Sequence, residues 1–174
     1  MLHKILATGG IGVLRTDTLY GVVAKADNEA AVQRVYDVKQ RSAHKSPIVL
    51  IASYEQLFDA PSGIEKVVCD KYWPGKVSII LAATHAPLWL QRGNGSVAYR
   101  MPDDENLRKL LQITGPLIAP SANPEGCMPA KNIAEAKEYF GAVVDFYVDG
   151  GQAPDDTPSK LVRVMSDGSE EYLR

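Results

Sequence analysis

Short hydrophobic runs alternate along the chain with segments in which hydrophobic residues recur every three or four positions. The runs predict buried β-strands, whereas the recurrence predicts helices with one apolar side. The expected strands span residues 11–15, 47–52, 77–82, 96–101, 116–119, 143–148, 160–165 and 170–173. The expected helices span residues 28–41, 106–113 and 132–140, with a single helical turn at residues 87–91.

Two polar pairs predict helix starts in the segment that precedes Trp73. Ser53 with Gln56, and Ser62 with Glu65, have the spacing of a capping box, in which each side chain bonds the other residue's backbone N–H. The proline after Trp73 cannot continue a helix and disfavours helical backbone at the residue before it. We therefore expect two successive helices that end near Trp73.

The order of these elements predicts the fold class. Strands alternate with helices over much of the chain, which favours an α/β fold, but the strands near residues 77–101 and 143–173 follow one another without full crossover helices. Parallel neighbours need such crossovers and antiparallel neighbours do not. We expect a twisted, open, mixed β-sheet flanked by helices. Because 174 residues can bury one substantial core but are short for two, a single domain is expected over residues 1–174.

Composition places the chain among ordinary folded proteins. Hydrophobic residues make up 45% and charged residues 23%, and the net charge of −2 gives no overall basic field of the kind that attracts nucleic acid. A local basic patch remains at Lys39, Arg41, His44 and Lys45. A solvated helix end, where cations favour the helix dipole, explains this patch equally well.

The hydrophobic stretches and the cysteines indicate a cytoplasmic protein without a membrane segment. The longest stretches, such as residues 77–83, fall far short of the roughly 20 residues that cross a bilayer. The first residues make a poor secretory signal, since they soon reach Gly9 and Gly10. Cys69 and Cys127 have no CxxC partner and are expected to be free thiols.

Neither zinc chemistry nor a serine triad is indicated by the histidines. His3, His44 and His85 are scattered and form no HExxH or His-Asp-Ser pattern. No metal-ligating site is expected.

Two hydroxyl-rich segments directly follow predicted strands. The first is RTDTLYG at residues 15–21, and the second is APSAN at residues 119–123. Ligand sites in open α/β sheets favour positions just beyond strand ends. Between them, KQR at residues 39–41 and SVAYRMP at residues 96–102 add cations and another hydroxyl. Together these segments predict an anion-binding site for more than one substrate.

Any nucleotide must be held without the common phosphate-binding loops. The chain contains neither GxxxxGK[ST] nor a GxGxxG turn. Charge can come from Lys39, Arg41 and Arg100, and arginine suits bidentate contact with phosphate or carboxylate. Neutral hydrogen bonds can come from Ser96, Ser121, Asn123 and Ser159. This inventory suits a triphosphate plus a small acid, although each residue taken singly is more simply explained by turn or surface structure.

Read in order, these motifs resemble those of the YrdC-like domain. The resemblance extends from about residue 5 to residue 165, and its strength lies in the joint order and spacing of the motifs. The motifs are TDTLYG at residues 16–21, KQR at 39–41 with SPI at 46–48, WPG at 73–75, RMP at 100–102, PSAN at 120–123, DGG at 149–151 and PS at 158–159.

That resemblance implies an L-threonylcarbamoyladenylate synthase. Such an enzyme makes threonylcarbamoyl-AMP and pyrophosphate from L-threonine, bicarbonate and ATP with Mg²⁺, for the t6A modification of tRNA. By analogy the residues expected to frame the nucleotide site and carry the reaction are Lys39, Arg41, Ser121 and Asn123, with further nucleotide contacts from Ser46, Ser96 and Ser159. The L-threonine positions implied are Thr16, Arg100, Ala119 and, less directly, Asp145.

The expected chemistry relies on positioning and charge rather than on a side-chain nucleophile. A threonine carbamate would attack the α-phosphorus, so negative charge builds on phosphate oxygens and on the departing pyrophosphate. Ser121 has no evident base partner and no GxSxG turn, so it is not expected to act as a nucleophile.

Some positions depart from the family pattern. They are Arg15, Pro124 and Lys160, which are expected to affect the local loop shapes and not the main cations. We expect the short, single-domain form of the family, which would rely on separate proteins for transfer to tRNA.

Two alternatives remain open. An RNA-binding module could use the same surface without turnover, with tRNA as its contact, but it should show a larger basic face. The second alternative is a paralogue that kept the fold and lost the reaction. The intact Lys-x-Arg and Ser-x-Asn pairs argue against this alternative.

Overall fold

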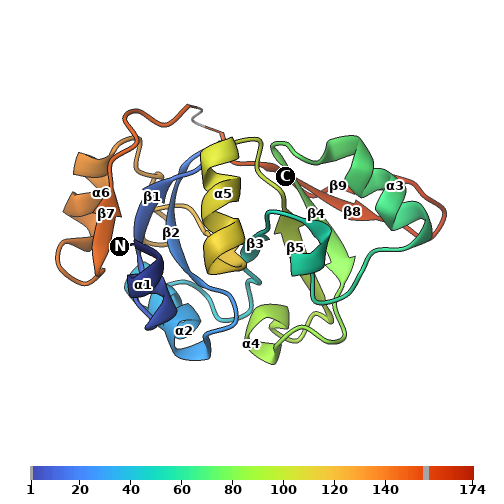
Figure 1. The fold of residues 1–174 in the computed structure, drawn as a ribbon, viewed down its shortest axis with the longest axis horizontal. Helices are drawn as coiled ribbons and strands as arrows, with labels where there is room; N and C mark the ends of the chain where they lie inside the picture. Colours follow the sequence, from blue (N-terminus) through green and yellow to red (C-terminus); the bar gives the residue numbers. More distant parts are fainter. Residues whose placement is uncertain (1, 155–156) are drawn as a thin grey trace.

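A computed structural model describes residues 2–154 and 157–174. Within these residues one nine-stranded sheet forms, in the order β7-β1-β2-β6-β3-β5-β4-β8-β9 (Figure 1). The strands are β1 (Gly12–Arg15), β2 (Tyr20–Lys25), β3 (Ile48–Leu50), β4 (Val77–Ala82), β5 (Ser96–Arg100), β6 (Leu117–Ile118), β7 (Phe146–Val148), β8 (Lys160–Val164) and β9 (Glu170–Tyr172). The helices are α1 (Leu2–Ala7), α2 (Glu29–Lys39), α3 (Gly63–Tyr72), α4 (Leu88–Gln91), α5 (Glu105–Thr114) and α6 (Ile133–Phe140), with a 3₁₀ turn η1 (Tyr54–Gln56).

The sheet is mixed, as the sequence predicts. β1 runs parallel to β7, β3 to β5 and β4 to β8, while the other neighbouring pairs are antiparallel. The antiparallel pairs β1–β2 and β8–β9 are hairpins. The expected fold class is therefore confirmed.

Each central strand supplies both faces of the sheet. In β2, Val22 packs into one hydrophobic cluster and Val23 into another, because successive side chains point to opposite faces. The first cluster contains buried side chains of the helices α2, α3, α4 and α6. The second contains Leu6 of α1 together with Leu107 and Leu111 of α5. The helices α1 and α5 therefore cover the second face over β1, β2, β3 and β6.

The structure contains two elements, β2 and α1, that the sequence did not predict. The strand β2 begins at Tyr20, inside the segment interpreted as a hydroxyl-rich loop, and nearly all of it is buried. The helix α1 is short, and its buried side chain is Leu6, which joins the cluster under α5. Both depend on tertiary contacts more than on local patterning.

The second of the two helices expected before Trp73 is confirmed as α3, but neither predicted capping box forms. Ser53 and Ser62 occupy N-cap positions, but neither side chain makes a capping hydrogen bond. Gln56 instead accepts from the Ala52 N–H at 2.7 Å and donates to the Leu111 carbonyl at 2.7 Å. The segment before α3 is accordingly a 3₁₀ turn anchored to α5 rather than an α-helix.

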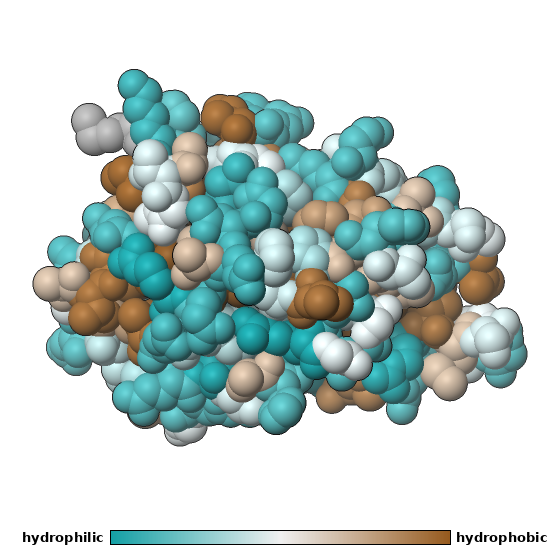
Figure 2. Space-filling view, turned by 90° about the horizontal axis from the view of Figure 1, so that it is seen from below, coloured by the Kyte–Doolittle hydropathy of each residue, from teal (hydrophilic) through white to brown (hydrophobic). Residues whose placement is uncertain are grey.

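Hydrophilic residues cover most of the face seen in Figure 2, and hydrophobic residues occur there in small separate groups. Across residues 2–154 and 157–174, no helix has the length and apolar character needed to cross a bilayer. Cys69 is buried and Cys127 exposed, and both are free thiols. The loop expected at residues 149–158 includes positions 155–156, which lie outside the described residues.

Candidate functional site

Two adjoining pockets open on the face of the sheet that α1 and α5 cover only in part. A small pocket of about 90 Å³ is lined by Thr16, Thr18, Leu19, Tyr20, Arg41, Ile48, Arg100, Ala119, Pro120, Ser121, Pro158, Ser159 and Arg174. A large pocket of about 460 Å³ is lined by Arg41, Ser46, Ile48, Ile80, Asn94, Ser96, Ala98, Leu161, Arg163 and Arg174. Since Arg41 and Arg174 line both pockets, the two spaces meet at these side chains.

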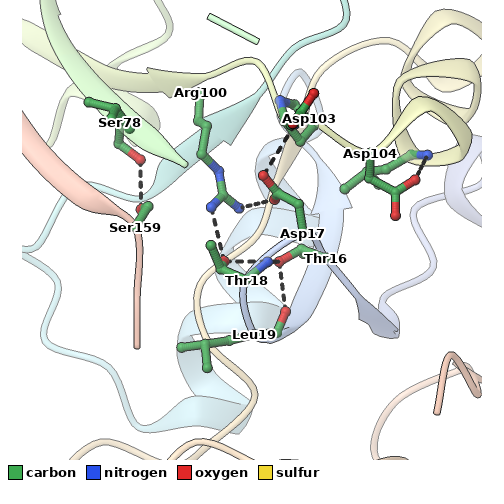
Figure 3. A network of polar contacts seen from close by, with 12 residues as sticks. Thr16, Asp17, Thr18, Leu19, Ser78, Arg100, Asp103, Asp104 and Ser159 are labelled. Carbon is green, nitrogen blue, oxygen red and sulfur yellow. Dashed lines mark hydrogen bonds and ion pairs between the residues drawn. The ribbon is translucent and has the colours of Figure 1, made fainter. Parts of the chain in front are cut away.

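Arg100 at the end of β5 is the centre of the polar network in the small pocket (Figure 3). Its guanidinium donates to Thr18 Oγ1 at 2.9 Å and lies 3.2 Å from Asp17 Oδ1. Arg100 is only 3% exposed and Asp17 8%. Burial lowers the pKa of Arg100 and the Asp17 carboxylate opposes that shift, so the pair keeps a buried cation in place.

Thr16 belongs to the turn between β1 and β2. Its hydroxyl donates to the Leu19 carbonyl at 2.7 Å, and the Thr18 N–H donates to Thr16 Oγ1 at 3.2 Å. This turn places Thr18 against Arg100, as Figure 3 shows. The hydroxyl of Thr16 therefore shapes the pocket through the turn that it closes.

The second hydroxyl-rich segment is held beside the first. The Ala122 N–H donates to the Tyr20 carbonyl at 2.7 Å, and Ser121 forms a β-bridge with Gly21. Ser121 Oγ donates to Asn123 Oδ1 at 2.6 Å. The structure thus brings together the two segments that the sequence placed after separate strands.

Asn123 supports this loop and does not line either pocket. Its Nδ2 donates to the carbonyls of Pro124 at 2.9 Å and Cys127 at 2.8 Å. Both Nδ2 hydrogens are therefore donated within the loop, and Oδ1 accepts from Ser121 Oγ. Its role in the structure is positioning.

Lys39 at the end of α2 is also a positioning residue. It is 2% exposed, and its Nζ donates to the backbone carbonyls of Ser121 and Asn123. Burial, and secondarily the charge of Arg41, lowers the pKa of Lys39 to about 7. Lys39 therefore ties α2 to the loop of Ser121 instead of facing the pockets.

Arg41 follows α2 and faces both pockets. Its NH2 donates to the Ser46 carbonyl at 3.1 Å, and its guanidinium lies 5.7 Å from the centre of the Tyr36 ring. Among the described residues its buried Nε has no hydrogen-bond partner. This cation is oriented by its surroundings while retaining donor capacity for a ligand.

At the edge of the large pocket near β3 and β5, neutral groups dominate. Ser46 Oγ donates to the Gln91 carbonyl at 3.0 Å and accepts from Asn94 Nδ2 at 2.9 Å. Ser96 at the start of β5 lines the same edge.

Most residues expected from the sequence reach these pockets. Those that line the small pocket are Thr16, Arg41, Arg100, Ala119, Ser121 and Ser159, and those that line the large pocket are Arg41, Ser46 and Ser96. Ser159 thus lies in the small pocket, where its hydroxyl is 2.9 Å from Ser78 Oγ (Figure 3).

The expectation for Asp145 requires correction. Its carboxylate accepts from the Ile11 N–H at 2.7 Å and pairs with Arg34 at 2.9 Å, and Arg34 holds its pKa below the usual range. Asp145 precedes β7, which runs parallel to β1 with Phe146 opposite Gly12. Thr16 lies at the other end of β1, and five residues of strand span about 16 Å. Asp145 therefore secures the strand starts, away from the pockets.

Arg174 is a site residue that the sequence analysis missed. Its Nε donates to the Ser159 carbonyl at 3.2 Å, and burial together with Arg41 lowers its pKa. It reaches the pockets because Leu161 in β8 bonds the Arg174 carbonyl at 3.0 Å. The only sequence signal was the predicted hairpin, which does not show which residue beyond it turns inward.

The lining of the two pockets is cationic. It contains Arg41, Arg100, Arg163 and Arg174, and none of the described lining residues is Asp or Glu. Across the described parts of the chain, no group of three or more His, Cys, Asp or Glu could hold a metal ion. The site is therefore suited to anions, with one small compartment and one large compartment.

A family model and named relatives match this chain over nearly its whole length. The Sua5/YciO/YrdC family model, described as "Telomere recombination", matches residues 4–174. The chain is 29% identical over 173 residues to a threonylcarbamoyl-AMP synthase of Marinobacter nauticus, covering 95% of this chain and 90% of that protein. It is 31% identical over 169 residues to the threonylcarbamoyl-AMP synthase of Pseudoalteromonas translucida, covering 92% and 90%.

Solved structures agree with the sequence relatives. The crystal structure of P. abyssi Sua5 complexed with L-threonine has a TM-score of 0.91 at 28% identity, covering 99% of this chain and 52% of that one. E. coli YciO shares the fold, with a TM-score of 0.88 at 20% identity and coverage of 99% and 86%. The chain belongs to the Sua5/YciO/YrdC family.

Proposed function

We propose that this chain is an L-threonylcarbamoyladenylate synthase that acts in the t6A modification of tRNA. The observation that carries the proposal is the pair of adjoining, arginine-lined pockets that share Arg41 and Arg174. A reaction that joins a small amino acid to the α-phosphate of a nucleotide needs two such compartments in contact. The named relatives support the same reaction.

L-threonine is assigned to the small pocket. Arg100 provides a buried cation for its carboxylate, and the turn of Thr16 with Ala119 bounds the remaining space. The P. abyssi relative binds L-threonine, which agrees with this assignment.

ATP is assigned to the large pocket. Ser46 and Ser96 offer neutral hydrogen bonds, and Arg41 stands where this pocket meets the small one. Ser121 and Ser159 reach the nucleotide from the small-pocket side of that junction. Lys39 and Asn123 act by fixing the loop of Ser121.

The reaction then follows from position and charge. Bicarbonate and the threonine amine give a carbamate and water, and a carbamate oxygen attacks the α-phosphorus. The bond to the bridging oxygen breaks, and pyrophosphate leaves with its electron pair. Arg41 and Arg174 face the phosphate oxygens on which charge accumulates, which is the arrangement that lowers such barriers.

Mg²⁺ is proposed to enter as part of the ATP substrate. Mg²⁺ is commonly held by substrate phosphates with few protein ligands, and the described lining of the pockets offers no carboxylate for it. No reaction step is assigned to a metal held by the protein itself.

The wider setting is part of the same proposal. We assign the protein to the cytoplasm, in line with its proposed role in tRNA modification. Because one sheet runs through the described chain, residues 1–174 are interpreted as a single domain. Transfer of the threonylcarbamoyl group to tRNA is assigned to separate proteins, with tRNA contact at the face on which the two pockets open. An RNA-binding module without turnover is less favoured, since the arginines gather inside pockets rather than over a broad basic face.

Pyrophosphate release by the purified chain tests the function. With ATP, Mg²⁺ and bicarbonate, release should depend on L-threonine and should be much slower with serine. Arg41→Ala should reduce threonine-dependent release by about tenfold or more, because it removes a cation from the reacting phosphate. Lys109→Ala is the control, since Lys109 is 62% exposed and pairs with Glu105 on the outside of α5. Salt-sensitive RNA binding without threonine-dependent release would favour the RNA-binding module instead.

A further inference from the structure

The large pocket extends across the sheet as far as Arg163 in β8. Strand register places Ile48, Ala98, Ile80 and Arg163 directly opposite one another on β3, β5, β4 and β8. Residues opposite each other in neighbouring strands share a face, and strands lie about 4.8 Å apart, so Arg163 is about 14 Å from Ile48. The pocket is therefore an elongated groove running perpendicular to the strands.

The two ends of this groove differ in chemistry. At the β3 and β5 end, Ser46, Asn94 and Ser96 are neutral. At the β8 end the polar side chain is the guanidinium of Arg163, reached across the apolar floor of Ile80 and Leu161. One end suits a nucleoside, and the other suits an anion.

The junction with the small pocket fixes the direction of a bound nucleotide. Arg41 and Arg174 line both pockets, so an α-phosphate that reacts with a group in the small pocket must lie beside them. Arg41 bonds the Ser46 carbonyl, and the Arg174 carbonyl accepts from Leu161, two residues before Arg163. From the junction one arm of the groove runs toward Ser46 and the other toward Arg163.

Resting on the synthase function proposed above, we propose that Arg163 binds the β- and γ-phosphates of ATP and the pyrophosphate that leaves. The nucleoside then occupies the opposite arm, against Ser46, Asn94 and Ser96. This arrangement places the leaving group and the attacking carbamate on different sides of the α-phosphorus, as in-line displacement requires. Arginine is suited to this role because its planar fork matches phosphate oxygens.

Glu171 is a weak competitor for the same guanidinium. Arg163 NH1 lies 3.0 Å from Glu171 Oε2, and the two side chains are 50% and 48% exposed. They face each other across the β8–β9 ladder. Because so exposed a pair contributes little stability, a phosphate can replace the carboxylate at small cost.

Binding of three ligands that differ in their phosphates tests the role of Arg163. Calorimetric titration of the full chain would compare ATP, AMP and inorganic pyrophosphate. Arg163→Ala should weaken ATP and pyrophosphate binding by about tenfold and leave AMP binding within about twofold, because AMP lacks the β- and γ-phosphates. Glu171→Gln should bind pyrophosphate at least as tightly as the parent chain.

Lys71→Ala is the matched control. Lys71 is 56% exposed and pairs with Glu170, the neighbour of Glu171, but it does not line either pocket. The Lys71→Ala substitution removes one positive charge, as Arg163→Ala does, and should leave the affinities for ATP, AMP and pyrophosphate unchanged.

Two results would overturn the assignment of Arg163. Equal losses for ATP and AMP in Arg163→Ala would place this residue beside the nucleoside, and unchanged pyrophosphate binding would remove it from the site. Weaker pyrophosphate binding by Glu171→Gln would contradict the competition between carboxylate and phosphate. A parent chain that binds neither ATP nor pyrophosphate would overturn the synthase function itself, and this inference with it.

Discussion

At the scale of single residues, Arg100 shows how the site maintains a buried charge. Its guanidinium is almost fully buried and has one carboxylate, Asp17, within 3.2 Å. Removing one partner from a buried pair leaves an uncompensated charge, which costs more than the pair contributes. Asp17 is thus required for stability even though it does not line either pocket.

Asp17→Ala should lower the free energy of unfolding by about 3 kcal/mol, since Arg100 would remain charged and unpaired. Urea denaturation measures the change. Asp103→Ala is the control, because Asp103 is 74% exposed and lies 3.9 Å from Arg108, and it should cost less than about 1 kcal/mol. In the double variant Asp17→Ala/Arg100→Met the loss should be smaller than the sum of the two single losses. Additive losses would show that the two side chains do not stabilise each other.

Lys39 gives a second residue-scale prediction through its pKa of about 7. In the unfolded chain a lysine has a pKa of about 10.4, so between about pH 7 and pH 10 the folded state binds fewer protons than the unfolded state. The free energy of unfolding should therefore rise with pH in that window, by at most about 1.4 kcal/mol per pH unit. Below about pH 7 the cost of the buried charge is fully present.

Urea denaturation between about pH 7 and pH 8.5 tests this slope. The window stops there because burial raises the pKa of Cys69 to about 12, which makes the folded state lose stability as pH increases further. Lys39→Met should lack the rise seen in the parent chain. Parallel pH dependences in the two proteins would show that Lys39 stays charged in the fold.

The chemical types of the site residues were predictable from the sequence, whereas their tasks were less so. Arg41 and Arg100 were predicted as cations of the site, and both line a pocket. Lys39 and Asn123 were expected at the nucleotide, yet their polar atoms are used by backbone carbonyls and by Ser121. A sequence shows that a donor is present, but only the fold shows whether another group already uses it.

At the scale of elements, the pairing of β1 with β7 depends on the absence of a side chain at Gly12. Gly12 lies directly opposite Phe146 in the parallel ladder. A Cβ at Gly12 would overlap the Phe146 ring. Close approach of these strands therefore sets the position of β1, which leads into Thr16.

Gly12→Ala should lower the free energy of unfolding by about 1–3 kcal/mol, the usual cost of adding a group to a packed interior. Thermal or urea denaturation measures the loss. Combining it with Phe146→Leu should recover part of the loss, compared with Phe146→Leu alone. If the double variant lost as much as the two single variants together, overlap with the ring would not be the cause.

Elements were predictable where their pattern was local. The helix α5 follows from leucines at helical spacing, and its N-cap is Asp104, whose side chain accepts from the Leu107 N–H. The strand β2 was missed because its first residues belong to the hydroxyl-rich motif and because β6, its partner on one side, is distant in sequence. The capping box at Ser53 does not form because the Gln56 amide instead bonds the Ala52 N–H and the Leu111 carbonyl of α5.

At the scale of the whole molecule, the site arises from incomplete coverage of one sheet face. Leu107 and Leu111 of α5 cover this face beside β1, β2 and β3, and the groove lies farther along, over β5, β4 and β8. The chain end lies near the same region (Figure 1), which brings Arg174 to the junction. Strand order, which the sequence did not predict, therefore decides which residues meet.

Charge is distributed unevenly over this chain of net charge −2. Four arginines line the two pockets. Arg100 pairs with Asp17 and Arg163 with Glu171, so the excess positive charge comes from Arg41 and Arg174 at the junction. Salt screens attraction between separated charges, with a Debye length near 10 Å at about 0.1 M. A polyanion that enters the groove should respond to this screening far more than a zwitterion does.

Raising NaCl from about 50 mM to about 500 mM should weaken ATP binding by about tenfold and change L-threonine binding by less than about twofold. Calorimetric titrations at several salt concentrations give both slopes. Arg41→Ala should flatten the slope for ATP, since one of the converging cations is lost, whereas Lys109→Ala on the outer face of α5 should not. A salt-independent ATP affinity would mean that neutral contacts at the Ser46 end dominate ATP binding. An equally steep salt dependence for L-threonine would mean that exposed cations, rather than buried Arg100, hold its carboxylate.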